Sequence, residues 1–319
     1  MKVVYMGTPG FACRPLEALF ASEHEVLAVV TGQAKRRGRR GMPCPTDVCC
    51  TATDLGLPIL TPKTLKSKKL HDQLAELKPD VFVVIAFRIL PPSLLNLPRL
   101  GAINIHGSLL PRYRGAAPIH WAIINGETET GLTSFFLNEQ VDTGNIILRT
   151  KTEIKPDDTY DSLYARLSEI SGPFLLDTLG TIGNPEFKPL PQDESRATPA
   201  PKITAFDAMI DWGFPAEKVH NFIRGLSSHP GAWTLFRDHK LKILRSARTD
   251  HPGLDRTRPG TIIPDRKRLL VQCSQSAIEL QAVVPEGRKP MDGIAFINGH
   301  KPREGEILGE TGKEVRKTN

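Results

Sequence analysis

The chain has 319 residues, about twice the length of a typical single domain, so its length favours two folded units. Its 39% hydrophobic and 24% charged residues exclude a disordered or collagen-like chain. No apolar stretch reaches the roughly 18 residues of a membrane span. Residues 1–7 read as a strand and a turn rather than a leader peptide, so we expect a cytoplasmic protein that does not contact membranes.

The net charge of +7 is unevenly distributed. Residues 201–319 carry 20 Lys and Arg against 14 Asp and Glu, whereas residues 1–200 carry 22 against 21. Five cations also fall within six positions: Lys35, Arg36, Arg37, Arg39 and Arg40. This distribution indicates a polyanionic partner, and ordinary solvated basic surfaces remain the alternative explanation.

The number of cysteines is odd, and none of them forms a CxxC pair: Cys13, Cys44, Cys49, Cys50 and Cys273. We expect reduced thiols rather than a disulfide framework. A metal site at residues 44–50 would need His24 or His71, and a second pair of ligands is missing. We therefore expect no bound metal.

Strand and helix patterns alternate over residues 1–183. Residues 80–87 are nearly all apolar, as a strand buried on both faces must be. Strands are expected at residues 3–6, 26–31, 80–87, 101–106, 131–137 and 146–154, and helices soon after Gly10 and at 47–55, 66–77, 116–124 and 159–179. This alternation predicts an α/β domain with a Rossmann-like, doubly wound, mostly parallel sheet.

The composition changes at residues 184–206, where prolines and polar residues without periodicity predict an extended linker. Beyond it, a helical pattern covers residues 216–226. Short strand patterns then follow at 233–236, 240–244, 260–263, 268–273 and 277–284. They predict a smaller, open β-barrel (OB-like) domain over residues 207–310, followed by a loose tail at 311–319.

The turn Gly7-Thr8-Pro9-Gly10 after the first strand invites comparison with dinucleotide-binding loops. It lacks the GxGxxG spacing, and the second strand ends in Thr31 rather than in an acidic residue that would bind a ribose hydroxyl. These features argue against a nicotinamide cofactor. The loop can still line the crevice of a different ligand.

Polar residues are densest around the end of the strand at 101–106. Asn104 and His106 lie two residues apart, so their side chains share one face at the carboxyl end of this strand. Asp142 lies in a turn near another strand end, where ligands of such sheets also bind. An amide can stabilise an oxyanion, an imidazole can move a proton, and a carboxylate can fix the imidazole tautomer. This set suits direct acyl transfer to an amine, although each residue could equally have a structural role.

A longer run resembles the signature of the folate-dependent formyltransferases: Asn104-x-His106-x-Ser108-Leu109-Leu110-Pro111-x-x-Arg114-Gly115, followed by Asp142-Thr143-Gly144. The sequences at 7–9, 112–119 and 200–203 are similar to those of the family members that formylate methionyl-tRNA. The similarity extends from residue 1 to about residue 308. It implies a Rossmann-like domain followed by a domain of open β-barrel type.

The resemblance implies transfer of a formyl group from 10-formyltetrahydrofolate to the α-amino group of initiator methionyl-tRNA, for translation initiation, with no obligate protein partner. Asn104, His106 and Asp142 would carry catalysis. The folate site would include Ser108, Leu109, Leu110, Pro111, Phe87, Arg88, Ile89 and Leu90. The barrel domain would bind tRNA without taking part in the chemistry, and the basic segment at 35–40 would contact the acceptor arm.

Two other functions stay open. A formyltransferase that acts on a small amine, such as a sugar nucleotide, needs the catalytic domain but not a basic second domain. A catalytically silent RNA-binding module would need the basic charge alone, and the presence of Asn104, His106 and Asp142 argues against it.

Overall fold

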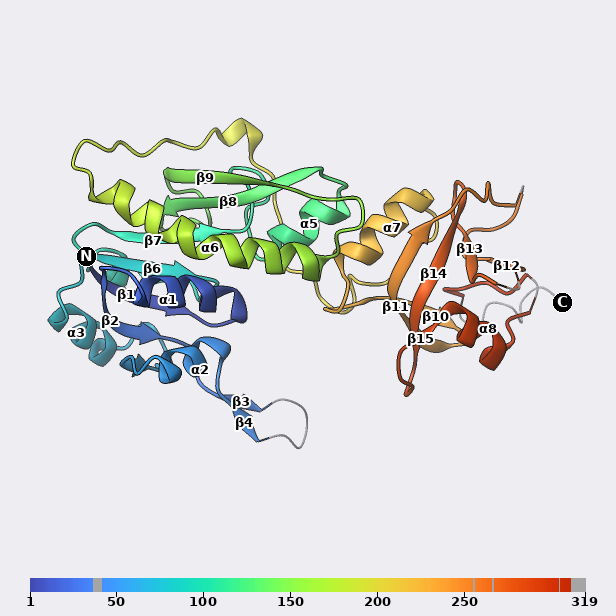
Figure 1. The fold of residues 1–319 in the computed structure, drawn as a ribbon, viewed down its shortest axis with the longest axis horizontal. Helices are drawn as coiled ribbons and strands as arrows, with labels where there is room; N and C mark the ends of the chain where they lie inside the picture. The colour runs from blue at the N-terminus through green and yellow to red at the C-terminus, as the bar shows by residue number, and fades with distance from the viewer. Residues whose placement is uncertain (37–41, 255, 266, 304, 311–319) are drawn as a thin grey trace. The chain divides into compact units, whose positions relative to one another are not determined.

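The computed structural model describes residues 1–36, 42–254, 256–265, 267–303 and 305–310 (Figure 1). Arg37, Arg39 and Arg40 and the expected tail at 311–319 lie outside the described residues. The chain divides into two compact units. Unit 1 comprises Met1–Pro118, Glu129–Glu153 and Tyr164–Pro201, and unit 2 comprises Ile119–Thr128, Ile154–Leu163 and Lys202–Asn319.

A seven-stranded sheet forms the centre of unit 1 (Figure 1). Its strands, from one edge to the other, are β5 (Ile59–Leu60), β2 (Glu25–Val30), β1 (Lys2–Gly7), β6 (Val81–Ile85), β7 (Ala102–His106), β8 (Glu129–Phe136) and β9 (Ile146–Glu153). The first five run parallel to one another, and β8 and β9 extend the sheet as antiparallel strands. The expected mostly parallel, doubly wound sheet is confirmed.

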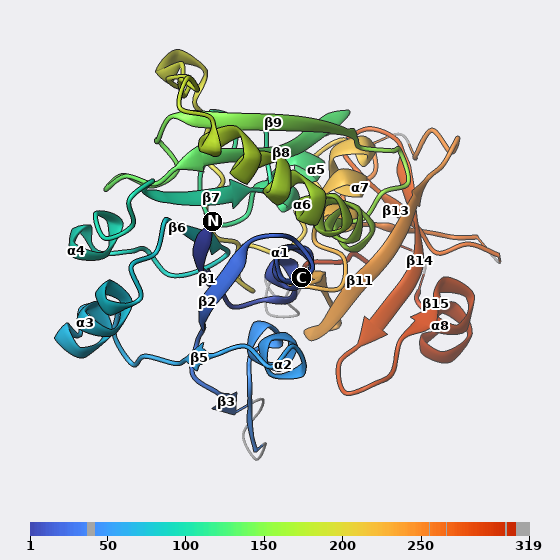
Figure 2. The ribbon, with the colours of Figure 1, turned by 60° about the vertical axis from the view of Figure 1, so that its left-hand side comes forward.

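Helices cover both faces of this sheet (Figures 1 and 2). Leucines of α3 and α4 pack against Val4 and Phe82 on one face. On the other face, α6 passes so close to α1 that a Cβ on Gly172 would lie 2.9 Å from the Cβ of Ala18. The helices are α1 (Cys13–Phe20), α2 (Asp47–Asp54), α3 (Lys68–Glu76), α4 (Pro92–Leu95) and α6 (Tyr160–Gly183).

The central strands are apolar because both of their faces are covered. All five residues of β6 are buried, as the apolar run at 80–87 predicts. Each fully buried valine, isoleucine or phenylalanine contributes about 1.5–3 kcal/mol relative to an exposed side chain. This packing makes the sheet a rigid support for the loops at its edge.

The loops after β6 and β7 begin at the same edge of the sheet, since Val84 pairs with Asn104 in parallel register. The loop between β8 and β9 is pressed against its own hairpin at Gly144, where a Cβ would collide with the carbonyl oxygen of Phe136. Shorter elements complete this part of the chain: η1 (Gly10–Ala12), β3 (Lys35–Arg36) and β4 (Pro43–Cys44).

The segment after α6, expected as a linker, is hydrogen-bonded to the rest of unit 1. Leu190 and Ile146 exchange two backbone hydrogen bonds of 2.7 and 2.8 Å. Further along, Arg114 N–H donates to the Thr198 carbonyl and Ala200 N–H donates to the Arg114 carbonyl. The segment contains one short helical turn, η2 (Glu194–Arg196). Residues 198–200 therefore run along the loop that follows β7, whereas Leu190 pairs with β9.

Unit 2 contains an antiparallel half-barrel sheet in the order β10-β11-β14-β13-β12, with β15 paired to β14. Its core includes Trp212, Leu241 and Phe296, which are at most 5% exposed. The elements are α5 (Pro118–Ile124), α7 (Ala216–Gly225), β10 (Ala232–Phe236), β11 (His239–Arg248), β12 (Ile262–Ile263), β13 (Leu270–Gln272), β14 (Ala277–Pro285), β15 (Met291–Asp292) and α8 (Gly293–His300). The expected smaller domain of open β-barrel type is confirmed. No helix in the described part of the chain is long and apolar enough to cross a membrane.

Candidate active site

His106 is the last residue of β7 and is 6% exposed. Its Nε2 lies 2.8 Å from the carbonyl oxygen of Tyr113. Because a carbonyl oxygen can only accept, Nε2–H donates this hydrogen bond, and Nδ1 keeps a lone pair when the ring is neutral. The Tyr113 carbonyl therefore fixes the tautomer, a role that was expected for the Asp142 carboxylate.

Asp142 lies in the loop between β8 and β9 and is also buried. Its Oδ2 is 3.7 Å from His106 Nδ1, which is within the range of an ion pair but beyond a hydrogen bond. The same oxygen accepts a hydrogen bond of 2.8 Å from Gly115 N–H. The Asp142 carboxylate is thus held where it can stabilise a positive charge on the imidazole.

Asn104 lies on β7 two residues before His106, on the same face of the strand. Its Oδ1 is buried and finds no hydrogen-bond partner among the described residues. A buried acceptor without a partner costs about 1–3 kcal/mol. Such an atom on the same strand face as His106 indicates a site for a group that donates a hydrogen bond.

The loop at 108–111 is held by hydrogen bonds to β8. Thr133 Oγ1 donates to the Ser108 carbonyl at 2.7 Å and accepts from Leu110 N–H at 3.0 Å. Ser108 Oγ donates to the Arg112 carbonyl. Ser108, Leu110 and Pro111 are buried, and Leu109 keeps part of its side chain accessible. Of these four expected folate contacts, Ser108 and Leu110 thus take part in hydrogen bonds that hold the loop.

The loop after β6 exposes different groups. The Ile89 side chain is 74% exposed, and Ala86 has a left-handed φ of 47°. Arg88 donates to the carbonyls of Pro62 and Lys63 and lies over the Phe87 ring at 5.1 Å. Leu90 and the partly buried Phe87 pack in the core cluster of α3 and α4. Ile89 and Arg88 are therefore the accessible members of this expected set.

Of the basic segment at 35–40, the structure describes Lys35 and Arg36. Both are exposed and form β3, which pairs with β4. Of the cysteines, Cys273 is buried, and burial raises the pKa of its thiol to about 12, so it is unreactive. Within the described ranges, no three His, Cys, Asp or Glu side chains gather as a metal ion would require.

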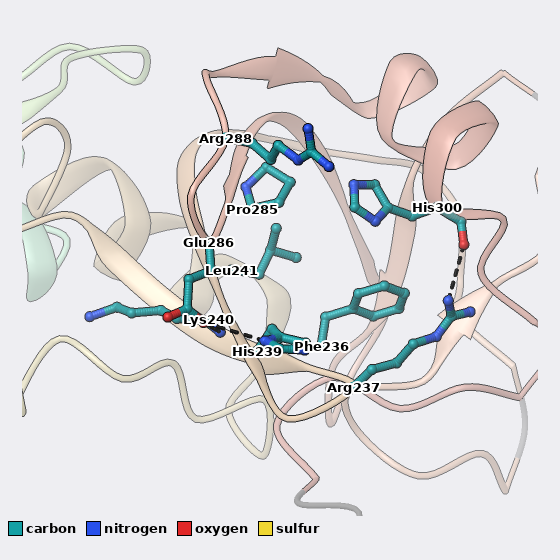
Figure 3. Close-up of a pocket in the computed structure, with 9 residues that line it drawn as sticks. All are labelled: Phe236, Arg237, His239, Lys240, Leu241, Pro285, Glu286, Arg288 and His300. Carbon is teal, nitrogen blue, oxygen red and sulfur yellow. Dashed lines mark hydrogen bonds and ion pairs between the residues drawn. The ribbon is translucent and has the colours of Figure 1, made fainter.

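Unit 2 has a cavity of about 320 Å³ beside the turn between β10 and β11 (Figure 3). Arg237, Lys240 and Arg288 bring three positive charges to it, against the single acidic side chain of Glu286. Arg237 is already paired with Glu306 through hydrogen bonds of 2.6 and 2.9 Å. The cavity also has apolar walls, formed by Phe236, Leu241 and Pro285.

Three groups around the His106–Asp142 pair were not expected from the sequence: the Tyr113 carbonyl, the Gly115 N–H and the Gln192 side chain. Gln192 Nε2 donates to the carbonyls of Asp142 and Gly144. Gly115 belongs to the signature run, so it could have been suspected. Gln192 lies 50 residues beyond Asp142 in a segment without periodicity, and the sequence contains no signal for it.

The chain matches two family models: formyl transferase over residues 1–179, and formyl transferase, C-terminal domain, over residues 202–301. The methionyl-tRNA formyltransferase of Chlorobium chlorochromatii is 42% identical over 315 residues, which cover 97% of this chain and 99% of that protein. That of Moorella thermoacetica is 41% identical over 311 residues, with the same coverage of 97% and 99%.

Solved structures share the fold at lower identity. The sugar 3N-formyl transferase WlaRD matches with a TM-score of 0.65 and 19% identity, over 91% of this chain and 99% of that one. HypX from Aquifex aeolicus, in complex with tetrahydrofolic acid, matches with a TM-score of 0.64 and 18% identity over 94% of this chain. This chain spans about half of HypX, 47% of its length. Given the two family models and the relatives at 41–42% identity, the chain belongs to the formyl transferase family.

Proposed function

We propose that the chain transfers a formyl group from 10-formyltetrahydrofolate to the α-amino group of methionine on initiator tRNA, for translation initiation. The observation that carries the proposal is the match to relatives named methionyl-tRNA formyltransferase over 97% of this chain, both units included. The sugar 3N-formyl transferase WlaRD also shares the fold over 91% of this chain, but at only 19% identity. As an enzyme of translation initiation, the chain would act in the cytoplasm.

The polar groups at the end of β7 support the chemistry. Bound 10-formyltetrahydrofolate would supply the formyl carbon, to which the amine nitrogen bonds while the bond from this carbon to N10 breaks. Asn104 Nδ2 donates to the formyl oxygen as it gains negative charge, and the buried Oδ1 accepts an N–H of the amine. His106 Nδ1 takes the proton that the amine loses and returns it to N10. Asp142, 3.7 Å away, stabilises the imidazolium in between.

The folate would bind at the edge of the sheet where the loops after β6 and β7 begin. Of the residues expected there, Ile89 and Arg88 are exposed and Leu109 is partly accessible, so their side chains are available for contact. The other members of the set are Phe87, which is partly buried, and Leu90, Ser108, Leu110 and Pro111, which are buried. These five would act by shaping the two loops and by offering backbone groups.

Transfer RNA would contact both parts of the chain. The acceptor arm of the tRNA would contact the basic segment, which consists of Lys35, Arg36, Arg37, Arg39 and Arg40. Residues 207–310 would hold the phosphate backbone, and the positively charged cavity with Lys240 and Arg288 is a suitable contact. Phosphate contacts add affinity without reading sequence. Residues 1–183 would then carry all three catalytic side chains.

The test is a formyl-transfer assay with 10-formyltetrahydrofolate as donor and with either methionyl initiator tRNA or small amines, such as an amino-sugar nucleotide, as acceptors. The proposal expects formylmethionyl-tRNA as the product and no formylated small amine. Transfer to the small amine alone would replace the proposal with the small-amine function. Tight tRNA binding without any transfer would indicate a silent RNA-binding module.

A further inference from the structure

The side chain of Gln192 uses all of its hydrogen-bonding groups within unit 1. Nε2 donates to the Asp142 carbonyl at 2.9 Å and to the Gly144 carbonyl at 2.8 Å. Oε1 accepts from Arg114 Nε at 3.1 Å and from Nη2 at 2.7 Å. An amide has two N–H donors and two acceptor lone pairs, so Gln192 is fully satisfied here. Its four bonds join the loop of Asp142 to the loop of His106.

These bonds close a ring around the His106–Asp142 pair. Gln192 holds the backbone of Asp142, the Asp142 carboxylate accepts from Gly115 N–H at 2.8 Å, and Gly115 follows Arg114, which binds Gln192. Tyr113, the residue before Arg114, provides the carbonyl oxygen that lies 2.8 Å from His106 Nε2 and orients the imidazole. Both the Tyr113 carbonyl and the Gly115 N–H are therefore adjacent in sequence to Arg114, which binds Gln192.

Arg114 is itself held firmly, so it is a stable anchor for Gln192. Its side chain is 13% exposed and makes hydrogen bonds of 2.7 and 2.8 Å to the Glu194 carboxylate. These bonds raise the pKa of Arg114 above its ordinary value. Its backbone pairs with Thr198 and Ala200 of the same segment that carries Gln192. Residues 192–200 thus form several hydrogen bonds with Arg114 in the loop that follows His106.

Asp142 needs such support. Its φ of 56° lies in the left-handed region, which residues with a side chain adopt uncommonly, Asp more readily than most, and its carboxylate is 3.7 Å from His106. The two side chains come from different strand ends, so no single element fixes their separation. A displacement of about 1 Å at a reacting group can lower a rate about 10²-fold.

We propose that Gln192 is a positioning residue, which holds the Asp142 loop against the His106 loop so that the carboxylate and the imidazole stay at their working distance. This inference rests on the proposed function of His106 and Asp142. Gln192 has no contact with the reacting atoms and acts through Asp142. A carboxylate at this position would face two carbonyl oxygens and repel both, whereas its bond to Arg114 would survive.

The test compares Gln192→Ala and Gln192→Glu with the wild-type chain in the formyl-transfer assay. We expect kcat to fall by about tenfold or more in both variants, with the KM values for folate and tRNA within about twofold of wild type. We also expect the acidic limb of the pH profile of kcat to move to lower pH, because a carboxylate that moves away stabilises the imidazolium less. Gln73→Ala, on the exposed surface of α3, is the matched control and should leave both readouts unchanged.

Each outcome has one interpretation. An inactive wild-type chain contradicts the proposed function. An active wild type with unchanged kcat and an unchanged pH profile in Gln192→Ala contradicts the positioning role alone. A rise in KM without a fall in kcat would make Gln192 part of a binding surface instead. Loss of the thermal unfolding transition in both variants would also overturn the proposal, because Gln192 would then be needed for the fold.

Discussion

At the scale of single residues, Asn104 and His106 carry the proposed chemistry. Replacing either with alanine should lower kcat by ~10²-fold or more, because an oxyanion donor or a proton carrier is lost. Asn104→Ala also removes a buried acceptor that has no partner among the described residues. The melting temperature of this variant should therefore equal or exceed that of wild type. Near-wild-type turnover in either variant would refute the assignment.

His220 gives unit 2 a defined pH dependence. It lies on α7, and its Nδ1 is 3.0 Å from Ser246 Oγ. Burial, together with the charges of Arg224 and Arg248, lowers its pKa to about 4. The unfolded chain has a histidine pKa of about 6.5 and therefore binds more protons between these values. Stability should consequently fall as the pH drops from 6.5 to 4, by about 1–2 kcal/mol from this residue once solvent screening is allowed for.

Urea unfolding at pH 7 and pH 5, followed by tryptophan fluorescence, tests this expectation. The loss of unfolding free energy between the two pH values should be smaller in His220→Gln than in wild type, because glutamine does not titrate. Equal losses in both proteins would show that His220 is not the group responsible.

Side chains at strand ends were predictable from the sequence, and the groups that hold them were not. Asn104 and His106 stand two apart before a glycine, and strand geometry places them on one face. The Tyr113 group that orients His106 is a backbone carbonyl, which every residue type has. Gln192 reaches Asp142 across 50 positions of chain, and such a contact follows from tertiary structure alone.

At the scale of elements, the long strands and helices follow from their patterns. The run of apolar residues predicted β6. The helical spacing of apolar residues predicted α6 (Tyr160–Gly183), although Pro173 lies inside it. Two-residue strands such as β5 and β15 are too short to show any periodicity. The segment after α6 lacks periodicity because it pairs irregularly, through Leu190 and Thr198, with parts of unit 1 that are distant in sequence.

The basic segment after β2 is the element for which we predict a direct effect on tRNA. Replacing Arg36, Arg37, Arg39 and Arg40 with alanine should raise the KM for tRNA, on the order of tenfold, and flatten its dependence on salt, because fewer counterions are released from the phosphates. The KM for the folate serves as the internal control and should not change. If the salt dependence stays as steep as in wild type, these charges do not contact the nucleic acid.

At the scale of the whole molecule, the two units differ in charge and in chemistry. Residues 201–319 carry the larger share of the net charge, whereas Asn104, His106 and Asp142 all belong to unit 1. The sequence predicted two folded units from length and composition. It did not indicate that residues 119–128, between β7 and β8, and residues 154–163, which follow β9, group with unit 2, because that assignment depends on contacts between distant segments.

The central claim is that this chain formylates a methionine that is attached to initiator tRNA. The most direct measurement is kcat/KM for formyl transfer to three acceptors: charged initiator tRNA, charged elongator tRNA and free methionine. We predict the highest value for the charged initiator tRNA. We also predict that transfer to free methionine stays at or near background, because the basic surfaces contribute binding only when a polyanion carries the amine. Equal values for free methionine and the charged initiator would contradict the account.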